Sequence, residues 1–440
     1  MSRSAGIAAA LCVFAAGCPS AATRDGDADT DADRATDGGD AEAPETPEAT
    51  DSLLDDLGVD GGEGDAGEDA EGWDFGADLW DPMRDCDAAP ADPLAWVAPP
   101  CGDGCRQVAF AAQPRGQFAA SERWLAYRAA HRTWMVNLDS GDEAVLFCHP
   151  EFVGSYGIGV DGDAAVLAIG TDFPTDLGHV AYGALWATDL VSLRQWAVAD
   201  WVNPYPAQWA APFQLAQYSN RVALTVLQIR GDDPSSWVQR IDVLTADIRT
   251  GLTTPVTDLG WPCCLGWPDI GGNWVVYSTT DAVRAYDIER GVTIGADIVG
   301  DQIWPRTDGV NVIWIDHRNY PGGYGRGGSW DIYSYNFVSE AERRITTPAT
   351  PVAEDAEPDM LGDIVVWSDR RNATPEEPHH SDLFLWRYST GSEQQLTFAA
   401  GAARSPKVTS DGVFFDWVPN PEPDPYLADH AICKQDLPPP

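Results

Sequence analysis

The feature that most constrains this chain is a unit of about 50 residues that recurs from residue 118 onward. Residues 309–319 read GVNVIWIDHRN and residues 362–372 read GDIVVWSDRRN, at a constant offset of 53. After a loop, residues 331–337 match residues 382–388 at an offset of 51. Because only the intervening loop has changed length, the chain repeats one supersecondary unit.

A shorter signature marks the predicted end of the third strand in each unit. It is a polar residue followed by an apolar one, often with glycine three positions further on. It occurs at Asn137-Leu138, Asp189-Leu190, Asp247-Ile248, Asp287-Ile288, Asn336-Phe337, Arg387-Tyr388 and Asp436-Leu437. The gaps are 52, 58, 40, 49, 51 and 49 residues, which indicates seven units. Glycine suits the turns because its backbone reaches angles that other residues resist.

Each unit contains apolar runs bounded by turn residues, such as 274–277, 312–315 and 364–367. These runs are rich in β-branched and aromatic side chains, which favour strands buried on both faces. Four such strands per unit are typical of a propeller blade. We therefore expect an all-β fold with one seven-bladed β-propeller, and a six-bladed ring is the alternative. A solenoid would need capping repeats, which the sequence does not show.

The last unit lacks a fourth strand, because the chain reaches three prolines after Leu437 and proline cannot continue a strand ladder. An incomplete blade would expose an unpaired edge. Residues 106–111 form a lone strand-like run before the first unit. We predict that they pair with the last unit and close the ring. We also predict a disulfide from Cys433, on the strand that they would join, to Cys101 or Cys105.

The charge of the chain is strongly negative, with 69 acidic and 27 basic residues and a formal net charge of −42. Such a charge repels nucleic acid and anionic lipid, so neither is an expected partner. Between residues 24 and 92 lie 25 acidic residues and three arginines. This composition predicts a disordered acidic linker over 19–92. Its alternating aspartates also suggest a calcium loop, but the glycine and glutamate positions of that template are not filled.

The N-terminal segment has the layout of a secretory signal. Arg3 precedes an apolar run of thirteen residues that is too short to span a bilayer core, which needs roughly 20 residues. Its ending, Ala16-Gly17-Cys18, resembles a bacterial lipobox, which implies lipidation at Cys18. Cleavage after Ala22 is the alternative. The expected domains are a signal peptide over 1–18, the linker over 19–92 and the propeller over 93–440.

Motifs that carry chemistry are scarce. No zinc, phosphate-loop or nucleophile-elbow motif is complete, so the sequence predicts no cofactor, no metal site and no catalytic residue. Two equivalent triplets are candidate rim-binding residues: Asp316, Arg318 and Asn319 in one unit, and Asp369, Arg371 and Asn372 in the next. Alternatively, Asp and Asn close turns and Arg pairs with the neighbouring Asp, and the repetition with the blades favours this structural role.

The repeat itself resembles a known family. The run at 362–372, followed by DLFLW at 382–386 and QLT at 395–397, resembles the TolB-like or WD40-like propeller repeat of bacterial envelope and surface proteins. The resemblance implies a β-propeller fold. It does not imply an activity, because propellers host unrelated functions.

The predicted cellular location and the predicted fold together suggest a function class. We expect a monomeric outer-membrane lipoprotein that faces the periplasm or the cell surface, holds to the membrane only through its lipid, and binds a protein or glycan at a propeller face. One alternative is a propeller-fold polysaccharide lyase or hydrolase, although the sequence favours a protein that is not an enzyme. A component of a Tol-Pal-like envelope system is the second alternative.

Overall fold

The computed structural model describes one all-β propeller unit. The described residues are 104–111, 118–129, 132–148, 153–175, 178–202, 209–230, 238–257, 266–279, 282–295, 302–319, 330–347, 352, 356–419 and 430–439. They all belong to the compact unit Trp80–Pro440, and they form strands and turns without a helix. The expected signal peptide, linker and Cys18 lie outside them.

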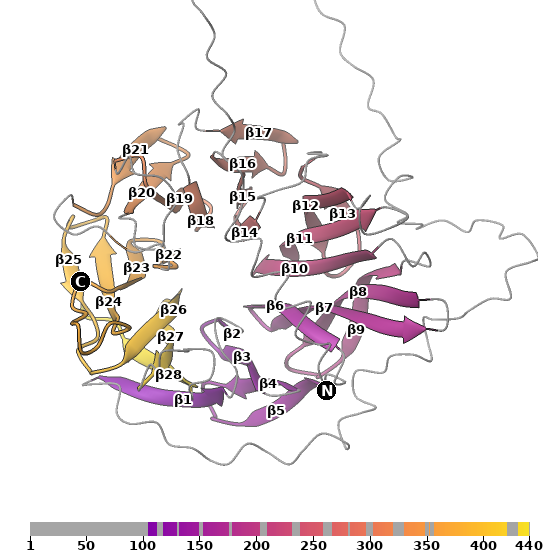
Figure 1. The fold of residues 1–440 in the computed structure, drawn as a ribbon, viewed down its shortest axis with the longest axis horizontal. Coiled ribbons are helices and arrows are strands. Elements are labelled where there is room, and N and C mark those ends of the chain that lie inside the picture. The colour runs from indigo at the N-terminus through magenta and orange to yellow at the C-terminus, as the bar shows by residue number, and fades with distance from the viewer. Residues whose placement is uncertain are drawn as a thin grey trace, which may run out of the picture. The chain divides into compact units, whose positions relative to one another are not determined.

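The strands form seven antiparallel sheets of four strands, as the repeat predicts (Figure 1). Blades 1 to 3 are β2(Phe118–Ala120), β3(Trp124–Ala129), β4(Arg132–Asn137), β5(Glu143–Cys148); β6(Val153–Asp161), β7(Ala164–Thr175), β8(Gly178–Asp189), β9(Gln195–Val202); and β10(Trp209–Tyr218), β11(Arg221–Arg230), β12(Val238–Asp247), β13(Thr253–Pro255). Blades 4 and 5 are β14(Gly266–Gly271), β15(Trp274–Ser278), β16(Val283–Asp287), β17(Val292–Gly295); and β18(Gln302–Thr307), β19(Asn311–Asp316), β20(Asp331–Asn336), β21(Ala341–Arg344). Blade 6 is β22(Asp359–Leu361), β23(Ile364–Asp369), β24(Asp382–Arg387), β25(Glu393–Gln395), and blade 7 is β26(Ala402–Thr409), β27(Gly412–Val418), β28(His430–Asp436) with β1(Cys105–Ala111).

The seven-unit signature is confirmed strand by strand. The third strand of each blade ends at the polar residue of the signature, from Asn137 in β4 to Asp436 in β28. In the turn that follows β12, Asp247 accepts the backbone N–H groups of Arg249 and Thr250, and Gly251 takes a φ of 74°. This geometry explains why an Asp or Asn and a later glycine recur together.

Packing between blades forms the core. One apolar cluster joins blades 5 and 6 around Trp367, and another joins blades 6 and 7 around Trp417. Both indoles are fully buried. The first strands of the blades contact one another in order, and β26 contacts β2, so the innermost strands form a closed ring. Figure 1 shows this ring, with the first strand of each blade around its centre.

Ring closure by the N-terminal strand is confirmed. β1 pairs antiparallel with β28, so that Arg106 lies opposite Lys434 and Ala111 opposite His430. The last blade thereby gains the outer strand that its own sequence lacks. The chain closes its ring with strands from its two ends.

The disulfide predicted from Cys433 is wrong. Cys433 is a free, fully buried thiol, and burial raises its pKa to about 12. Cys105 is disulfide-bonded, and because Cys433 is free, its partner is a cysteine other than Cys433. Cys101 lies outside the described residues. The register gives the reason: Cys105 pairs with Gln435, and Cys433 pairs with Gln107. The two cysteines are diagonal neighbours, about 7–8 Å apart, beyond the reach of a disulfide.

No helix among the described residues is long and apolar enough to cross a membrane.

Candidate functional site

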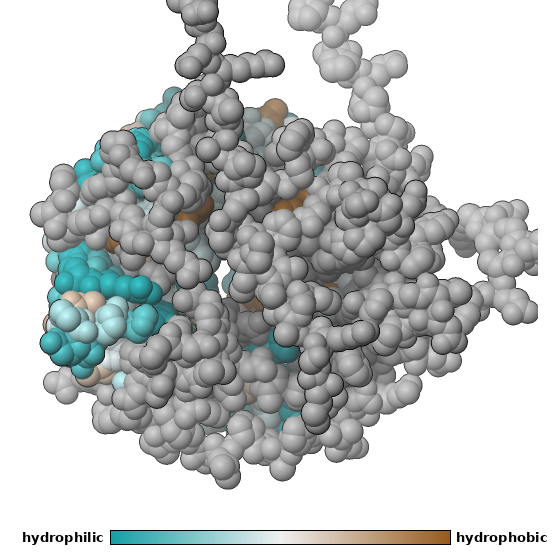
Figure 2. Space-filling view, in the orientation of Figure 1, coloured by the Kyte–Doolittle hydropathy of each residue, from teal (hydrophilic) through white to brown (hydrophobic). Residues whose placement is uncertain are grey.

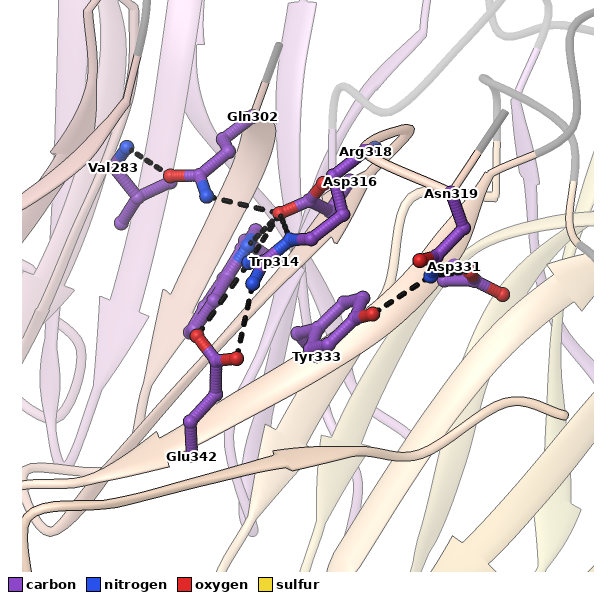
Figure 3. A network of polar contacts seen from close by, with 9 residues as sticks. All are labelled: Val283, Gln302, Trp314, Asp316, Arg318, Asn319, Asp331, Tyr333 and Glu342. Carbon is purple, nitrogen blue, oxygen red and sulfur yellow. Dashed lines mark hydrogen bonds and ion pairs between the residues drawn. The ribbon is translucent and has the colours of Figure 1, made fainter. Parts of the chain in front are cut away.

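The first candidate site is the rim network of blade 5 (Figure 3). Asp316 ends β19 and is fully buried. Its Oδ2 accepts hydrogen bonds from the side chains of Arg318, at 2.5 and 2.8 Å, and from Trp314 Nε1 at 3.0 Å. Gln302 Nε2 donates to the same oxygen at 2.9 Å, and Gln302 Oε1 accepts the backbone N–H of Val283 in blade 4. All of these donors to the carboxylate belong to blade 5, and Gln302 in turn links the network to blade 4.

The remaining rim residues of blade 5 are also engaged. Arg318 forms an ion pair with Glu342 at 3.0 Å, and its guanidinium lies 4.1 Å from the ring centroid of Tyr333. Asn319 Nδ2 donates to Asp331 Oδ2 and to the Tyr333 hydroxyl. These bonds tie the loop after β19 to the beginning of β20, as Figure 3 shows.

Blade 6 repeats the arrangement at the second triplet. Asp369 accepts from Trp367 Nε1 and from Arg371, which also pairs with Glu393. Asn372 Nδ2 donates to Asp382 Oδ2 at 2.8 Å. The Trp–Asp, Arg–Asp, Arg–Glu and Asn–Asp contacts recur in both blades, which is what a structural device repeated with the fold requires. Figure 2 shows that hydrophilic described residues gather over this blade, around β24 and β25.

The electrostatics of the rim agree with a structural role. Burial alone would raise the pKa of Asp316, but hydrogen bonds from Arg318 and Trp314 outweigh it, and the pKa lies below its ordinary value. For Arg371, burial alone would lower the pKa, but the bonds to Asp369 and Glu393 raise it. All six predicted side chains thus bond within their own blades. Ligand binding at this rim stays a prediction.

The second candidate site is on the innermost strands of blades 4 to 7. Four charged residues occupy equivalent positions there, each directly after a proline: Asp269, Arg306, Asp359 and Lys407. All four side chains are partly exposed, whereas the residues on either side of Asp269, Arg306 and Asp359 are buried. Because the first strands form the inner ring, these charges alternate in sign along one half of the channel wall.

A strained backbone sets up this wall. The residue before each proline has a positive φ: 50° at Trp267, 56° at Trp304, 44° at Glu357 and 49° at Ser405. In β14, β18 and β26 the strand register shifts at this point, which is the mark of a β-bulge. A bulge re-aims the side chains that follow it, and left-handed backbone at a residue other than glycine costs of order 1–3 kcal/mol. The same strained backbone conformation therefore occurs in four blades at the start of this wall.

The acidic members of the wall join neighbouring blades. Asp269 Oδ2 in blade 4 accepts the backbone N–H of Thr307 in blade 5 at 2.7 Å. Asp359 Oδ2 in blade 6 accepts the backbone N–H of Val408 in blade 7, also at 2.7 Å. Gln214 of blade 3 does the same for Trp267 of blade 4. Each bond crosses a blade boundary at the channel, so each acid has a clear structural role.

The cationic members have fewer partners. Arg306 Nη1 donates to its neighbour Pro305 O at 2.8 Å, and its Nε lies 3.9 Å from Asp359 Oδ1. That separation is too long for a hydrogen bond. Among the described residues, the Lys407 ammonium forms no hydrogen bond or ion pair. Burial and the charge of Arg306 lower the pKa of Lys407, although Asp359, Asp269 and Glu357 oppose the shift.

Asp269 is the most perturbed acid of the wall. Burial raises its pKa from 3.8 to about 6, although Arg306, Lys407 and the Thr307 N–H act in the opposite direction. Perturbed acids and bases that share a cleft are typical of functional sites. Beside them lie the indoles of Trp267 and Trp304, 4.7 Å apart between centroids and both partly exposed.

Sequence reasoning missed this channel wall, although a signal was present. The recurring Pro-x-x-x-Gly turn at Pro268, Pro305 and Pro358 marks it, because the residue after each proline is charged. The fourth copy, at Pro406, escapes the pattern because its glycine comes two residues later. A search for charge at a fixed position of the repeat would have found all four residues.

Fold and site together define a seven-bladed β-propeller with a charged channel wall. No protein-family model and no curated protein sequence matches the chain. Among solved structures, an acylaminoacyl peptidase from Pyrococcus horikoshii aligns over 70% of this chain and 49% of its own, with 12% identity and a TM-score of 0.48. TolB from Acinetobacter baumannii aligns over 70% of this chain and 67% of its own, with 13% identity and a TM-score of 0.38. The propeller domain of the Trilobed protease from Pyrococcus furiosus aligns over 61% and 78%, with 10% identity and a TM-score of 0.41. The match spans about half the length of the peptidase.

Proposed function

We propose that this protein is a binding module of the bacterial cell envelope, and that its propeller takes a ligand at the channel wall of blades 4 to 7. The observation that carries the proposal is the Lys407 ammonium, which lies on the inner strand of blade 7 and has no hydrogen-bond or ion-pair partner among the described residues. A desolvated charge without a partner is costly, so a ligand that supplies an acceptor would be stabilised there.

Two further observations support a channel site over a rim site. The predicted rim residues are bonded to one another, as in the Arg318–Asp316 pair with its 2.5 Å contact. The channel wall instead combines a few polar groups with an aromatic pair, Trp267 and Trp304. Binding sites for small ligands are typically apolar or aromatic surfaces with a small number of placed polar groups.

The proposed cellular location of the module rests on the N-terminal sequence. We propose that the signal segment exports the chain and that Cys18 carries the lipid anchor. The acidic linker between Cys18 and the propeller would then hold the disc away from the membrane. An acyl anchor with more than one chain gives stable attachment, whereas a single chain does not.

A screen with matched variants tests the channel proposal. Full-length protein would be applied to arrays of glycans and peptides, together with Arg306→Gln and Leu193→Ser. Leu193 lies in an exposed turn of blade 2, with 50% of its surface accessible, and serves as the control. We expect bound ligands to be lost with Arg306→Gln and retained with Leu193→Ser. Ligands that survive Arg306→Gln but are lost when Glu342 at the rim is replaced would refute a channel site.

A further inference from the structure

Among the described residues, the channel wall has more hydrogen-bond donors without a partner than acceptors without one. Each acid already accepts a protein donor: Asp269 from Thr307, Asp359 from Val408, and Glu357 from the Ser405 hydroxyl. The two cations have hydrogen-bond donors that no described protein group accepts. Lys407 has three N–H donors with no protein acceptor among the described residues, and Arg306 uses one of its five on Pro305 O. The wall therefore has donors to offer.

We propose that this wall binds a small organic carboxylate, with its two oxygens between Arg306 and Lys407 and its body against Trp304 and Trp267. The inference rests on the proposed channel function and names the ligand class. Arg306 and Lys407 belong to blades 5 and 7 and lie on either side of Asp359 in blade 6. The long 3.9 Å contact from Arg306 Nε to Asp359 leaves that donor open to a better acceptor.

The charge balance favours a single negative charge on the ligand. Asp359 and Glu357 act on Lys407, so a dianion such as phosphate would add two charges beside two carboxylates. A neutral amide or hydroxyl acceptor would offer the Lys407 ammonium a dipole only. A charged acceptor adds the attraction of opposite charges to the hydrogen bond that the ammonium donates. A carboxylate satisfies both conditions and also offers two oxygens to the Arg306 fork.

The aromatic pair limits the body of the ligand. Trp267 and Trp304 lie at an interplanar angle of 40°, each is partly exposed, and the Arg306 guanidinium is 5.9 Å from the Trp304 ring centroid. A flat or apolar group gains most from contact with indole faces. The proposed ligand is thus a carboxylate carried on a planar or apolar body, for which benzoate is the simplest probe.

The composition of the chain provides a direct assay, because it contains only two lysines, Lys407 and Lys434. Protein grown with lysine labelled with ¹³C at Cε gives one NMR signal for each, and Lys407→Arg assigns them. Lys434 is 4% exposed and donates to Asp411, so its signal is an internal reference for the fold. Benzoate should move the Lys407 signal saturably and leave the Lys434 signal in place. Benzamide, the neutral analogue, should move neither.

Arg306→Gln tests the second cation. It should weaken benzoate binding about 10-fold or more, as expected for loss of one charge-assisted hydrogen bond. An unchanged Lys434 signal in the variant shows that the fold is intact. Equal movement of Lys407 with benzamide or inorganic phosphate, or no movement with benzoate and acetate alike, would overturn the carboxylate assignment. If array ligands without a carboxylate are still lost with Arg306→Gln, the channel function stands and only the ligand class is wrong.

Discussion

Replacement of Asp269 by asparagine tests the physics of the channel wall. Burial raises the pKa of Asp269 from 3.8 to about 6. A raised pKa in the folded state means that the folded protein holds this proton more tightly than the unfolded chain does. The stabilisation from this group is therefore complete below about pH 4, falls as the pH rises through about 6, and is absent above that range.

The size of the effect follows from the shift. About two pKa units correspond to about 3 kcal/mol, at about 1.4 kcal/mol per unit. Because the side chain is partly exposed, solvent weakens the effect, so we expect about 1–2 kcal/mol in practice. Asp269→Asn removes the charge but keeps an oxygen that accepts the Thr307 N–H. The variant should therefore have a higher free energy of unfolding than the wild type at about pH 8, by this amount.

Urea unfolding at about pH 5 and about pH 8 measures the difference. The advantage of Asp269→Asn should shrink as the pH falls, since the wild-type carboxyl takes up its proton. Asp411→Asn is the opposite control: burial raises the pKa of Asp411, but the hydrogen bond from Lys434 outweighs it and lowers the pKa, so neutralisation should destabilise the protein at about pH 8. A loss of stability with Asp269→Asn at about pH 8, or a difference that does not depend on pH, would refute the reasoning.

Three other perturbations address the rim, the ring and the anchor. Arg371→Ala leaves the buried Asp369 without its ion pair and should cost about 3–5 kcal/mol in urea unfolding, whereas Arg290→Ala, at a side chain that is 77% exposed, should cost little. Deletion of residues 105–111 exposes the edge of β28, so size-exclusion chromatography should show a shift from the wild-type elution volume to aggregate, and an unchanged elution volume would argue against a role of β1 in closure. Cys18→Ala should abolish partition into the detergent phase if Cys18 carries the anchor, and a variant that still partitions would exclude it.

The architecture was predictable because the sequence pattern of a blade recurs along the chain. Seven third strands end at one signature, and a missing last strand together with a lone first strand indicates how the ring closes. The channel wall was harder to predict, because Asp269 and Lys407 gain their meaning only when blades 4 and 7 are placed in one ring. The wrong disulfide has a similar cause. A sequence places Cys433 on a strand but does not give the register, and a shift of two residues separates it from Cys105.

The position of β1 decides how the propeller bears force. β1 begins at Cys105, which is paired with Gln435 near the end of β28, so the chain enters β1 and leaves β28 at the same end of the β1–β28 ladder. Tension applied at the start of β1 and the end of β28 would act first on the pair Cys105–Gln435. It would then load the hydrogen bonds of the ladder one pair after another. If the upstream chain is held at a membrane and the ligand is held elsewhere, tension reaches the disc at its closing seam. The strand that completes the ring would then also be a strand that carries load.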